Sequence, residues 1–95
     1  MDPSCLDAEL TRLRKQGHPL VAVVACACAT PMGSFDPLSA LAEICARHQV
    51  WLHVDAAHGG AALLSERHRR LLKGIDQADS VVWDAHKMMF VPGLC

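Results

Sequence analysis

Lys87 and Asp55 are the two side chains of this sequence best suited to covalent amine chemistry. A lysine ammonium loses its proton readily when it is desolvated, and the neutral amine can then form a Schiff base with a carbonyl group. A carboxylate at the same site can hold a positive charge in place. A surface lysine paired with any nearby acid would also explain these residue types, so the chemistry depends on the elements that bring them together.

Apolar patterns along the chain predict a helix followed by a strand, three times over. Aspartate followed by proline predicts the start of the first two helices, because aspartate caps free N–H groups and proline fits the first turn; Ser65 could cap the third. Uninterrupted apolar runs with β-branched residues predict strands that are covered on both faces. The predicted helices span residues 2–17, 36–48 and 65–74, and the predicted strands span residues 20–26, 50–54 and 80–83.

This alternation predicts an α/β fold with three parallel strands and crossover helices that pack on the sheet. In such sheets, ligands bind outside the carboxyl ends of the strands. The chemistry-bearing residues follow the strands at that edge: Thr30 and Gly33 after the first, residues 55–60 after the second, and Asp84, His86 and Lys87 after the third. We therefore expect one binding site that is built from three loops.

Three local sequences resemble one enzyme family. They are HVDAAHGG at residues 53–60, DAHKMM at residues 84–89 and GSFDPL at residues 33–38, and they occur in the family's order with similar separations. Together they resemble the group II pyridoxal-phosphate-dependent amino-acid decarboxylases, which include enzymes for glutamate, cysteine sulfinate, diaminobutyrate and aromatic amino acids. The resemblance runs over the whole chain. It implies pyridoxal 5'-phosphate as the cofactor and an amino acid as the small-molecule substrate.

The resemblance assigns a role to individual residues. Lys87 matches the catalytic lysine that forms the Schiff base, and Asp55 matches the aspartate that pairs with the pyridine nitrogen of the cofactor. Ala57 matches the small residue against the ring face, and Thr30 matches a threonine that lines the cofactor site. His86 matches a histidine that could contact the phosphate or help to position the lysine. Backbone hydrogen bonding would explain this histidine equally simply, and ordinary packing would explain the alanine.

Four positions depart from the family pattern: Cys28, Ala29, His58 and Asp84. Where many relatives have Gly-Thr-Thr, this chain has Cys28, Ala29 and Thr30. Asp84 stands where asparagine is often found near the cofactor phosphate. Because a carboxylate would repel phosphate, we expect Asp84 to hydrogen-bond elsewhere. His58 replaces an aromatic residue, so the substrate side of the pocket is expected to differ.

The resemblance implies that residues 1–95 form a single unit, a part of the large domain of a fold-type-I pyridoxal-phosphate-dependent transferase, truncated at both ends. The family's upstream phosphate-binding loop and C-terminal small domain have no counterpart in these residues. Such a segment is expected to be inactive alone, and its parent enzyme is expected to be a homodimer.

The predicted reaction is amino-acid decarboxylation, a lyase activity. The sequence HKMM and the following Val91-Pro92 look like glutamate decarboxylases and favour an acidic substrate such as glutamate or cysteine sulfinate. Two alternatives stay open. Another fold-type-I enzyme, such as an aminotransferase or a sulfur lyase, would share the same lysine and aspartate. A noncatalytic truncated chain could act as an interaction module.

Charge and hydropathy bear on the partners of the chain. Nine Lys and Arg residues balance ten Asp and Glu residues, which argues against nucleic acid or a membrane as partner. The basic run at residues 67–73 reads as the solvated face of a helix. The hydrophobic share of 52% is high for so short a chain and suggests apolar faces that other chain or a second subunit covers.

The cysteines and the first residues predict a cytoplasmic protein. Five cysteines, an odd number, occur in apolar or helical surroundings, which is typical of reduced thiols. Met1 is followed by Asp2 and Pro3 without the apolar core of a secretory signal. Cys26 and Cys28 have no second ligand pair at zinc-site spacing, so no metal is expected.

Overall fold

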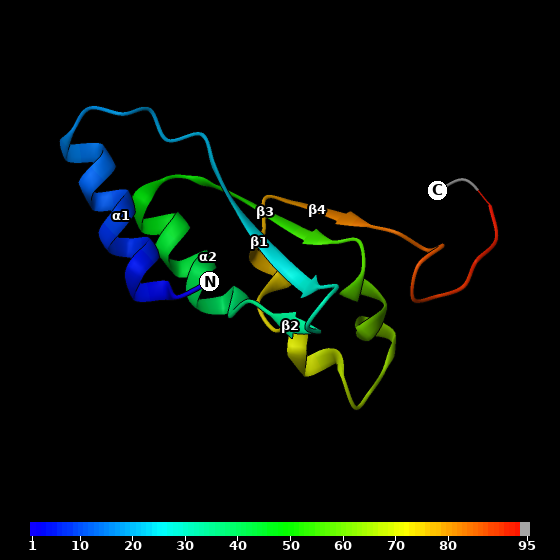
Figure 1. The fold of residues 1–95 in the computed structure, drawn as a ribbon. Helices are drawn as coiled ribbons and strands as arrows, with labels where there is room; N and C mark the ends of the chain where they lie inside the picture. The colour runs from blue at the N-terminus through cyan, green and yellow to red at the C-terminus, as the bar shows by residue number, and fades with distance from the viewer. Residues whose placement is uncertain (94–95) are drawn as a thin grey trace.

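The computed structural model describes residues 1–93 and has an α/β fold (Figure 1). In chain order, its elements are α1 (Pro3–Lys15), β1 (Ala22–Ala29), β2 (Ser34–Phe35), α2 (Leu38–His48), β3 (Trp51–Ala56), the 3-10 helices η1 (Gly59–Leu64), η2 (Arg69–Leu72) and η3 (Ile75–Gln77), and β4 (Ser80–Trp83). The four strands lie in the order β2-β1-β3-β4. Strands β1, β3 and β4 are parallel, as predicted, and the short β2 is antiparallel to β1.

Helix α1 begins where the sequence predicts. The side chain of Asp2 accepts a hydrogen bond from the backbone N–H of Cys5 at 2.9 Å, and Pro3 occupies the first turn. The side chain of Asp2 therefore satisfies one of the free N–H groups of the helix start. The hydrogen bonds to Ser4 and Cys5 also lower the pKa of the Asp2 carboxyl.

Helix α2 begins differently from the prediction. Pro37 is its N-cap residue, and no side chain caps the helix. The predicted cap, Asp36, uses its Oδ2 to accept a hydrogen bond from the backbone N–H of Cys26 at 2.7 Å, and its Oδ1 contacts the amino group of Met1. The prediction of an Asp36 cap is wrong because a tertiary contact with β1 takes this carboxylate.

The prediction of a third helix over residues 65–74 is also wrong, because the connection from β3 to β4 consists of three short 3-10 helices. Ser65 caps no helix with its side chain, and its backbone carbonyl accepts from the N–H groups of His68 and Arg69. Leu72 is the only buried residue of η2, so the apolar spacing anchors one turn rather than a continuous helix face. Gly74 has a φ of 94° and follows η2, where the sequence predicts the end of a helix.

Two strand ends lie beyond their predicted limits. Strand β1 continues to Ala29, and β3 continues to Ala56, so Asp55 is the penultimate residue of β3 rather than the first residue after it. The reason is pairing: Asp55 is in register with Cys26 on β1 and with Val82 on β4. The backbone pairing between the strands thus extends beyond the end of the apolar run.

The hydrophobic core lies between α2 and one face of the sheet. Leu38, Leu41 and Cys45 of α2 are buried together with Leu52 and Val54 of β3. Fully burying one leucine or valine side chain contributes about 1.5–3 kcal/mol, so this cluster fixes α2 on the sheet. Helix α1 packs on α2 and covers its outer side (Figure 1).

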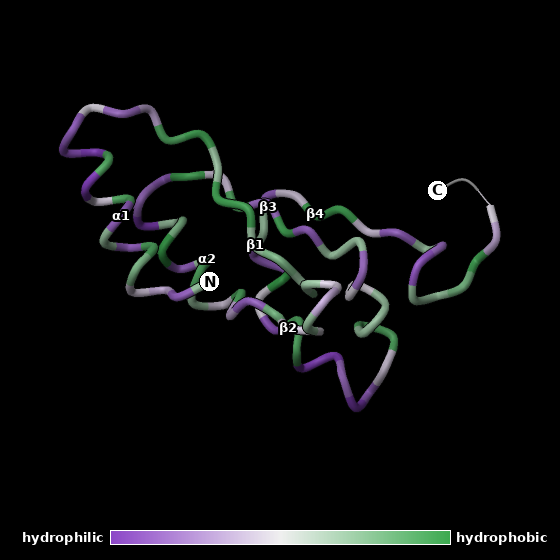
Figure 2. Tube along the Cα trace, in the orientation of Figure 1, coloured by the Kyte–Doolittle hydropathy of each residue, from purple (hydrophilic) through white to green (hydrophobic). Residues whose placement is uncertain are grey.

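The second face of the sheet is open in residues 1–93. Burial alternates along β3, where Leu52, Val54 and Ala56 are buried and Trp51 and Asp55 are exposed. The prediction of strands covered on both faces therefore fails for the described residues, although the apolar side chains are present. Figure 2 shows hydrophobic residues along β1 and β4 and a hydrophilic turn before η2. No helix of residues 1–93 is both long and apolar enough to cross a membrane.

Candidate cofactor site at the carboxyl edge of the sheet

Asp55 places a carboxylate on the open face of the sheet. It lies near the carboxyl end of β3, between Cys26 of β1 and Val82 of β4. Its Oδ1 accepts a hydrogen bond from the backbone N–H of Ala57 at 3.1 Å, and the residue is exposed. The local turn thus orients the carboxylate, which stays accessible on a face that is otherwise largely apolar.

The two glycines after Asp55 allow the turn to lie close against the sheet. A Cβ atom on Gly59 would lie 2.6 Å from the backbone nitrogen of Cys28 and 2.7 Å from the carbonyl oxygen of Ala27. A Cβ atom on Gly60 would lie 2.3 Å from Cδ1 of Trp83. A larger residue at Gly59 would displace the backbone of β1, and a larger residue at Gly60 would displace the Trp83 side chain, so the glycine pair lets the loop after β3 lie close against the sheet.

The turn after β4 contains the second group of candidate residues. Oδ1 of Asp84 accepts a hydrogen bond from the backbone N–H of His86 at 2.9 Å and contacts Nδ1 of the same residue at 2.6 Å. Nζ of Lys87 lies 3.8 Å from Oδ2 of Asp84. As expected, Asp84 hydrogen-bonds within its own loop. Its side chain is 15% exposed, whereas that of Lys87 is 41% exposed.

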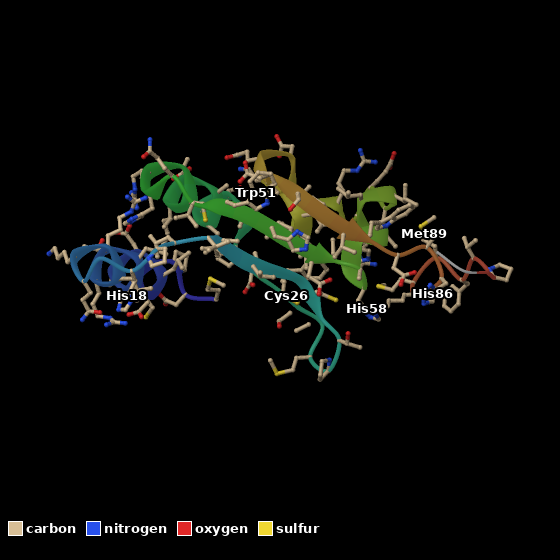
Figure 3. The ribbon with its side chains drawn as sticks, turned by 90° about the horizontal axis from the view of Figure 1, so that it is seen from above. His18, Cys26, Trp51, His58, His86 and Met89 are labelled. Atoms are coloured by element: carbon tan, nitrogen blue, oxygen red, sulfur yellow. The ribbon has the colours of Figure 1, made fainter. Side chains whose placement is uncertain are left out.

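The five predicted site residues all lie at the carboxyl edge of β1, β3 and β4. Thr30 is exposed in the turn after β1, Ala57 follows β3, and His86 and Lys87 follow β4. Figure 3 shows Cys26 on β1 and places His58 and His86 beyond the ends of β3 and β4. The strand order puts Asp55, near the end of β3, on the strand next to β4, which the loop of Lys87 follows. The individual roles of these residues stay predictions.

Cys26 is a neighbour of Asp55 that the sequence patterns did not single out for this edge. Its burial and the carboxylates of Asp55 and Asp36 raise the pKa of the Cys26 thiol. The thiol therefore stays protonated at neutral pH and is a poor nucleophile. No group of three or more His, Cys, Asp or Glu side chains within residues 1–93 is arranged to hold a metal ion.

Trp51, His53 and Ser80 form a hydrogen-bonded cluster on the same face, which the sequence analysis did not predict. Oγ of Ser80 accepts from Nε1 of Trp51 at 2.9 Å and lies 2.7 Å from Nδ1 of His53. The Ser80 hydroxyl accepts a hydrogen bond from Trp51, and it can at the same time donate its own proton in a hydrogen bond to His53. The spacing of His53 and Asp55 by two residues on one strand could have indicated their common face. The cluster ties β3 to β4 just before Asp55.

Comparison with known proteins identifies the family. The whole chain, residues 1–95, matches the pyridoxal-dependent decarboxylase conserved domain. The acidic amino acid decarboxylase GADL1 of Homo sapiens is 47% identical over 95 residues, which are 100% of this chain and 18% of that protein. The cysteine sulfinic acid decarboxylase of Rattus norvegicus is 47% identical over 89 residues, 94% of this chain and 18% of that protein. The chain belongs to the pyridoxal-dependent decarboxylase family.

Solved structures agree with this assignment. The crystal structure of mouse CSAD in apo form superimposes with a TM-score of 0.95 at 44% identity, over 100% of this chain and 20% of that one. The crystal structure of Oryza sativa TDC with PLP gives a TM-score of 0.94 at 30% identity, also over 100% of this chain and 20% of that one. The chain therefore spans about a fifth of the length of the relatives it matches.

The described residues fit the family's cofactor, pyridoxal phosphate. A flat ring with a positively charged nitrogen needs an accessible anion and small or apolar neighbours. Asp55 is an exposed carboxylate, Val82 shares its face, and the side chain of the following Ala57 is small. An exposed amine for covalent attachment is present in Lys87, in the adjacent loop.

Proposed function

We propose that this chain supplies the lysine and the aspartate of the cofactor site in a pyridoxal-phosphate-dependent amino-acid decarboxylase. The observation that carries the proposal is that Asp55 lies near the carboxyl end of β3 and Lys87 in the loop after the neighbouring parallel strand β4, in a chain of this family. Residues 1–95 are then one part of a larger cofactor-binding domain. The rest of that domain would cover the open face of the sheet.

Asp55 would act on the ring nitrogen. When bound, pyridoxal phosphate accepts the electrons that remain at the α-carbon after carbon dioxide leaves, and it does so best with a protonated ring nitrogen. Two opposite charges about 4 Å apart attract by about 4 kcal/mol at an effective dielectric constant of about 20. The Asp55 carboxylate would thus hold this proton in place at neutral pH.

The other residues would position the cofactor. Lys87 would hold it covalently through the side-chain amine and, once displaced by the substrate amine, could move protons near the α-carbon. The small side chain of Ala57 would leave space for the ring face, and Thr30 would line the site from the turn after β1. His86 would lie beside the lysine.

The substrate we propose is an amino acid with an acidic side chain. Two relatives that are 47% identical to this chain are named for acidic amino acids and for cysteine sulfinic acid. The tryptophan decarboxylase of Catharanthus roseus is among the similar solved structures, which also favours decarboxylation over the transaminase and sulfur-lyase alternatives. We further propose a homodimeric parent enzyme in the cytoplasm, where the free thiols of Cys5, Cys26, Cys28 and Cys45 would remain reduced.

Borohydride trapping tests the proposal. The complete decarboxylase that carries this segment would be loaded with pyridoxal phosphate, reduced with borohydride, digested and mapped by mass spectrometry. We expect the label on Lys87 and its loss in Lys87→Arg. Lys73→Arg is the matched control, because Lys73 is exposed in the connection before β4 and should not affect labelling. A label on another lysine would contradict the assignment.

A product assay separates the reaction classes. The same enzyme would be supplied in turn with glutamate, aspartate and cysteine sulfinate, each together with pyruvate as an acceptor for the amino group, and both carbon dioxide and the oxo acid derived from the substrate would be measured. A decarboxylase releases one carbon dioxide per amine formed, whereas a transaminase forms an oxo acid without carbon dioxide. Oxo acid as the main product from all three substrates would refute the decarboxylase proposal.

A further inference from the structure

Strand β4 carries little information about its own register on β3. Its last three residues are the apolar Val81, Val82 and Trp83, which are 44%, 40% and 51% exposed. Neither hydropathy nor burial alternates along them, so a shift by one residue would exchange one apolar side chain for another. A Cβ atom on Gly60 would lie 2.3 Å from Cδ1 of Trp83, so this ring packs against the glycine, but an apolar contact is less directional than a hydrogen bond. Groups outside the apolar run must therefore contribute to the register.

Asp79 supplies two hydrogen bonds directly before β4 begins. Its backbone N–H donates to the carbonyl oxygen of Leu52 at 3.0 Å. Its Oδ2 accepts a hydrogen bond from the backbone N–H of the same Leu52 at 2.7 Å. One residue thus binds both backbone groups of a single residue of β3. Because a shift of β4 along β3 would break both contacts together, Asp79 favours one register over its neighbours.

Ser80 provides a second fixed point at the first residue of β4. Its Oγ accepts a hydrogen bond from Nε1 of Trp51 at 2.9 Å and forms a second one with Nδ1 of His53 at 2.7 Å. Trp51 and His53 lie two residues apart on the same face of β3, and the hydroxyl bonds to both. In the observed register Ser80 is paired with His53. A shift by one residue would turn the hydroxyl to the other face and break both hydrogen bonds.

This register determines where the lysine loop begins relative to Asp55. Asp55 pairs with Val82, and Lys87 lies in the loop that follows Trp83. A shift by one residue would displace the start of that loop by about 3.3 Å along the strand. A misplacement of about 1 Å in a catalytic site can lower the rate about 100-fold. The relative position of the two candidate residues therefore depends on contacts at the opposite end of β4.

We propose that Asp79 and Ser80 are positioning residues that fix the register of β4 on β3 and thereby place Lys87 relative to Asp55. This inference rests on the proposed function for its catalytic meaning. Both residues lie at the amino end of β4, whereas the lysine loop follows its carboxyl end. They therefore act through the strand and not on the reacting atoms.

Hydrogen exchange of the complete enzyme tests the register directly. The double variant Asp79→Ala and Ser80→Ala loses three side-chain hydrogen bonds, so exchange of the backbone amides of β4 should become about tenfold faster or more. Exchange in β1 should not change. Ser39→Ala is the matched control, because Oγ of Ser39 donates a hydrogen bond to the carbonyl oxygen of Lys73 at 3.1 Å and makes no contact with β3 in the register described above. Unchanged exchange in β4, or an equal rise in β1 and β4, would overturn the proposal.

Kinetics and cofactor trapping test the catalytic consequence. In the double variant, the fraction of enzyme that borohydride labels at Lys87 should fall, and kcat should fall about 100-fold. Ser80→Thr retains the hydroxyl and should restore most of the activity that Ser80→Ala loses, whereas Ser39→Ala should leave kcat unchanged. A folded double variant with unchanged kcat would refute the positioning role.

A single variant covers the case in which the double variant does not fold. Ser80→Ala alone should then lower kcat about tenfold and speed exchange in β4, and the absence of both effects would refute the proposal. If borohydride labels a lysine other than Lys87 while exchange rises selectively in β4, the proposed function fails and the register assignment stands.

Discussion

Asp55 is the residue whose charge matters most for the proposed chemistry. Asp55→Asn keeps the side-chain shape and its hydrogen bond from Ala57 but removes the negative charge. We expect kcat of the complete enzyme to fall roughly 100-fold, since an attraction of a few kcal/mol on the ring nitrogen is lost. Steady-state measurement of carbon dioxide release checks this expectation. Asp76→Asn in η3, an exposed residue away from the edge, should retain full activity.

Gly59 limits which residues can follow β3. A Cβ atom at this position would meet backbone atoms of Ala27 and Cys28, which cannot move aside as a side chain can. Gly59→Ala is therefore expected to lower the free energy of unfolding by about 3 kcal/mol. Urea unfolding of the complete enzyme measures the change. Gly17→Ala meets no atom within 4 Å, so its cost should come only from the positive φ, about 1–2 kcal/mol. Equal effects would show that the close approach is not the cause.

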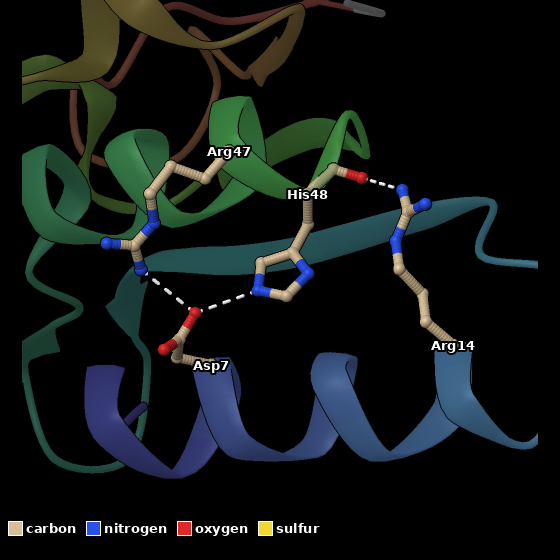
Figure 4. A network of polar contacts seen from close by, with 4 residues as sticks. All are labelled: Asp7, Arg14, Arg47 and His48. Carbon is tan, nitrogen blue, oxygen red and sulfur yellow. Dashed lines mark hydrogen bonds and ion pairs between the residues drawn. The ribbon is translucent and has the colours of Figure 1, made fainter.

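At the level of elements, α1 is held on α2 by a polar network (Figure 4). Oδ1 of Asp7 contacts Nε2 of His48 at 2.8 Å and accepts from Arg47 at 2.9 Å, while Arg14 donates to the carbonyl oxygen of His48. The hydrogen bond from His48, and then the charge of Arg47, lower the pKa of the Asp7 carboxyl.

The pKa of Asp7 predicts how this contact depends on pH. Because the folded pKa lies below the ordinary aspartate value of 3.8, the stabilisation is fully present above that value and is lost as the pH falls through the folded pKa. Asp7→Asn should therefore lower the melting temperature more at pH 7 than near pH 3, because pH 3 lies below the ordinary pKa of the group and part of the stabilisation is already lost there. Thermal unfolding at both pH values measures this difference. A constant difference across the range would argue against the Asp7 carboxylate as the cause.

At the level of the whole molecule, the open face of the sheet leaves apolar side chains exposed in residues 1–93. Val24 is 58% exposed, Trp51 is 52% exposed and Val82 is 40% exposed. The registers of the three strands place these side chains on one face together with Asp55. An apolar face of this kind is typical of a surface that is covered by further residues of the protein or by a second subunit.

Two substitutions on this face test whether the rest of the complete enzyme covers it. Val24→Thr with Val82→Thr should barely change the stability of the 95-residue chain and should reduce its self-association, measured by light scattering. In the complete enzyme the same pair should cost about 1–2 kcal/mol for each residue, since a polar hydroxyl would then be buried. Unchanged stability of the complete enzyme would mean that the face stays open there too.

The sequence by itself determined the order of the parallel strands along the chain, the start of α1 and the family. Local signals suffice for these features, because an apolar run predicts a strand and, at α1, Asp2 caps the helix through a contact only three residues away. The candidate residues at the strand ends could be predicted for the same reason, since they follow the apolar runs directly.

Only the tertiary structure decided which partners the polar side chains take. Asp36 bonds to the backbone of β1 instead of capping α2, and Asp79 accepts a hydrogen bond from the backbone N–H of Leu52, which is 27 residues away in the sequence. The connection before β4 forms 3-10 helices and approaches the start of α2 so closely that a Cβ atom on Gly74 would lie 2.5 Å from the backbone nitrogen of Ser39. Which face of the sheet is covered also depends on packing over long sequence separations. An apolar run predicts that a strand is buried, but the residues that bury it can lie anywhere else in the protein.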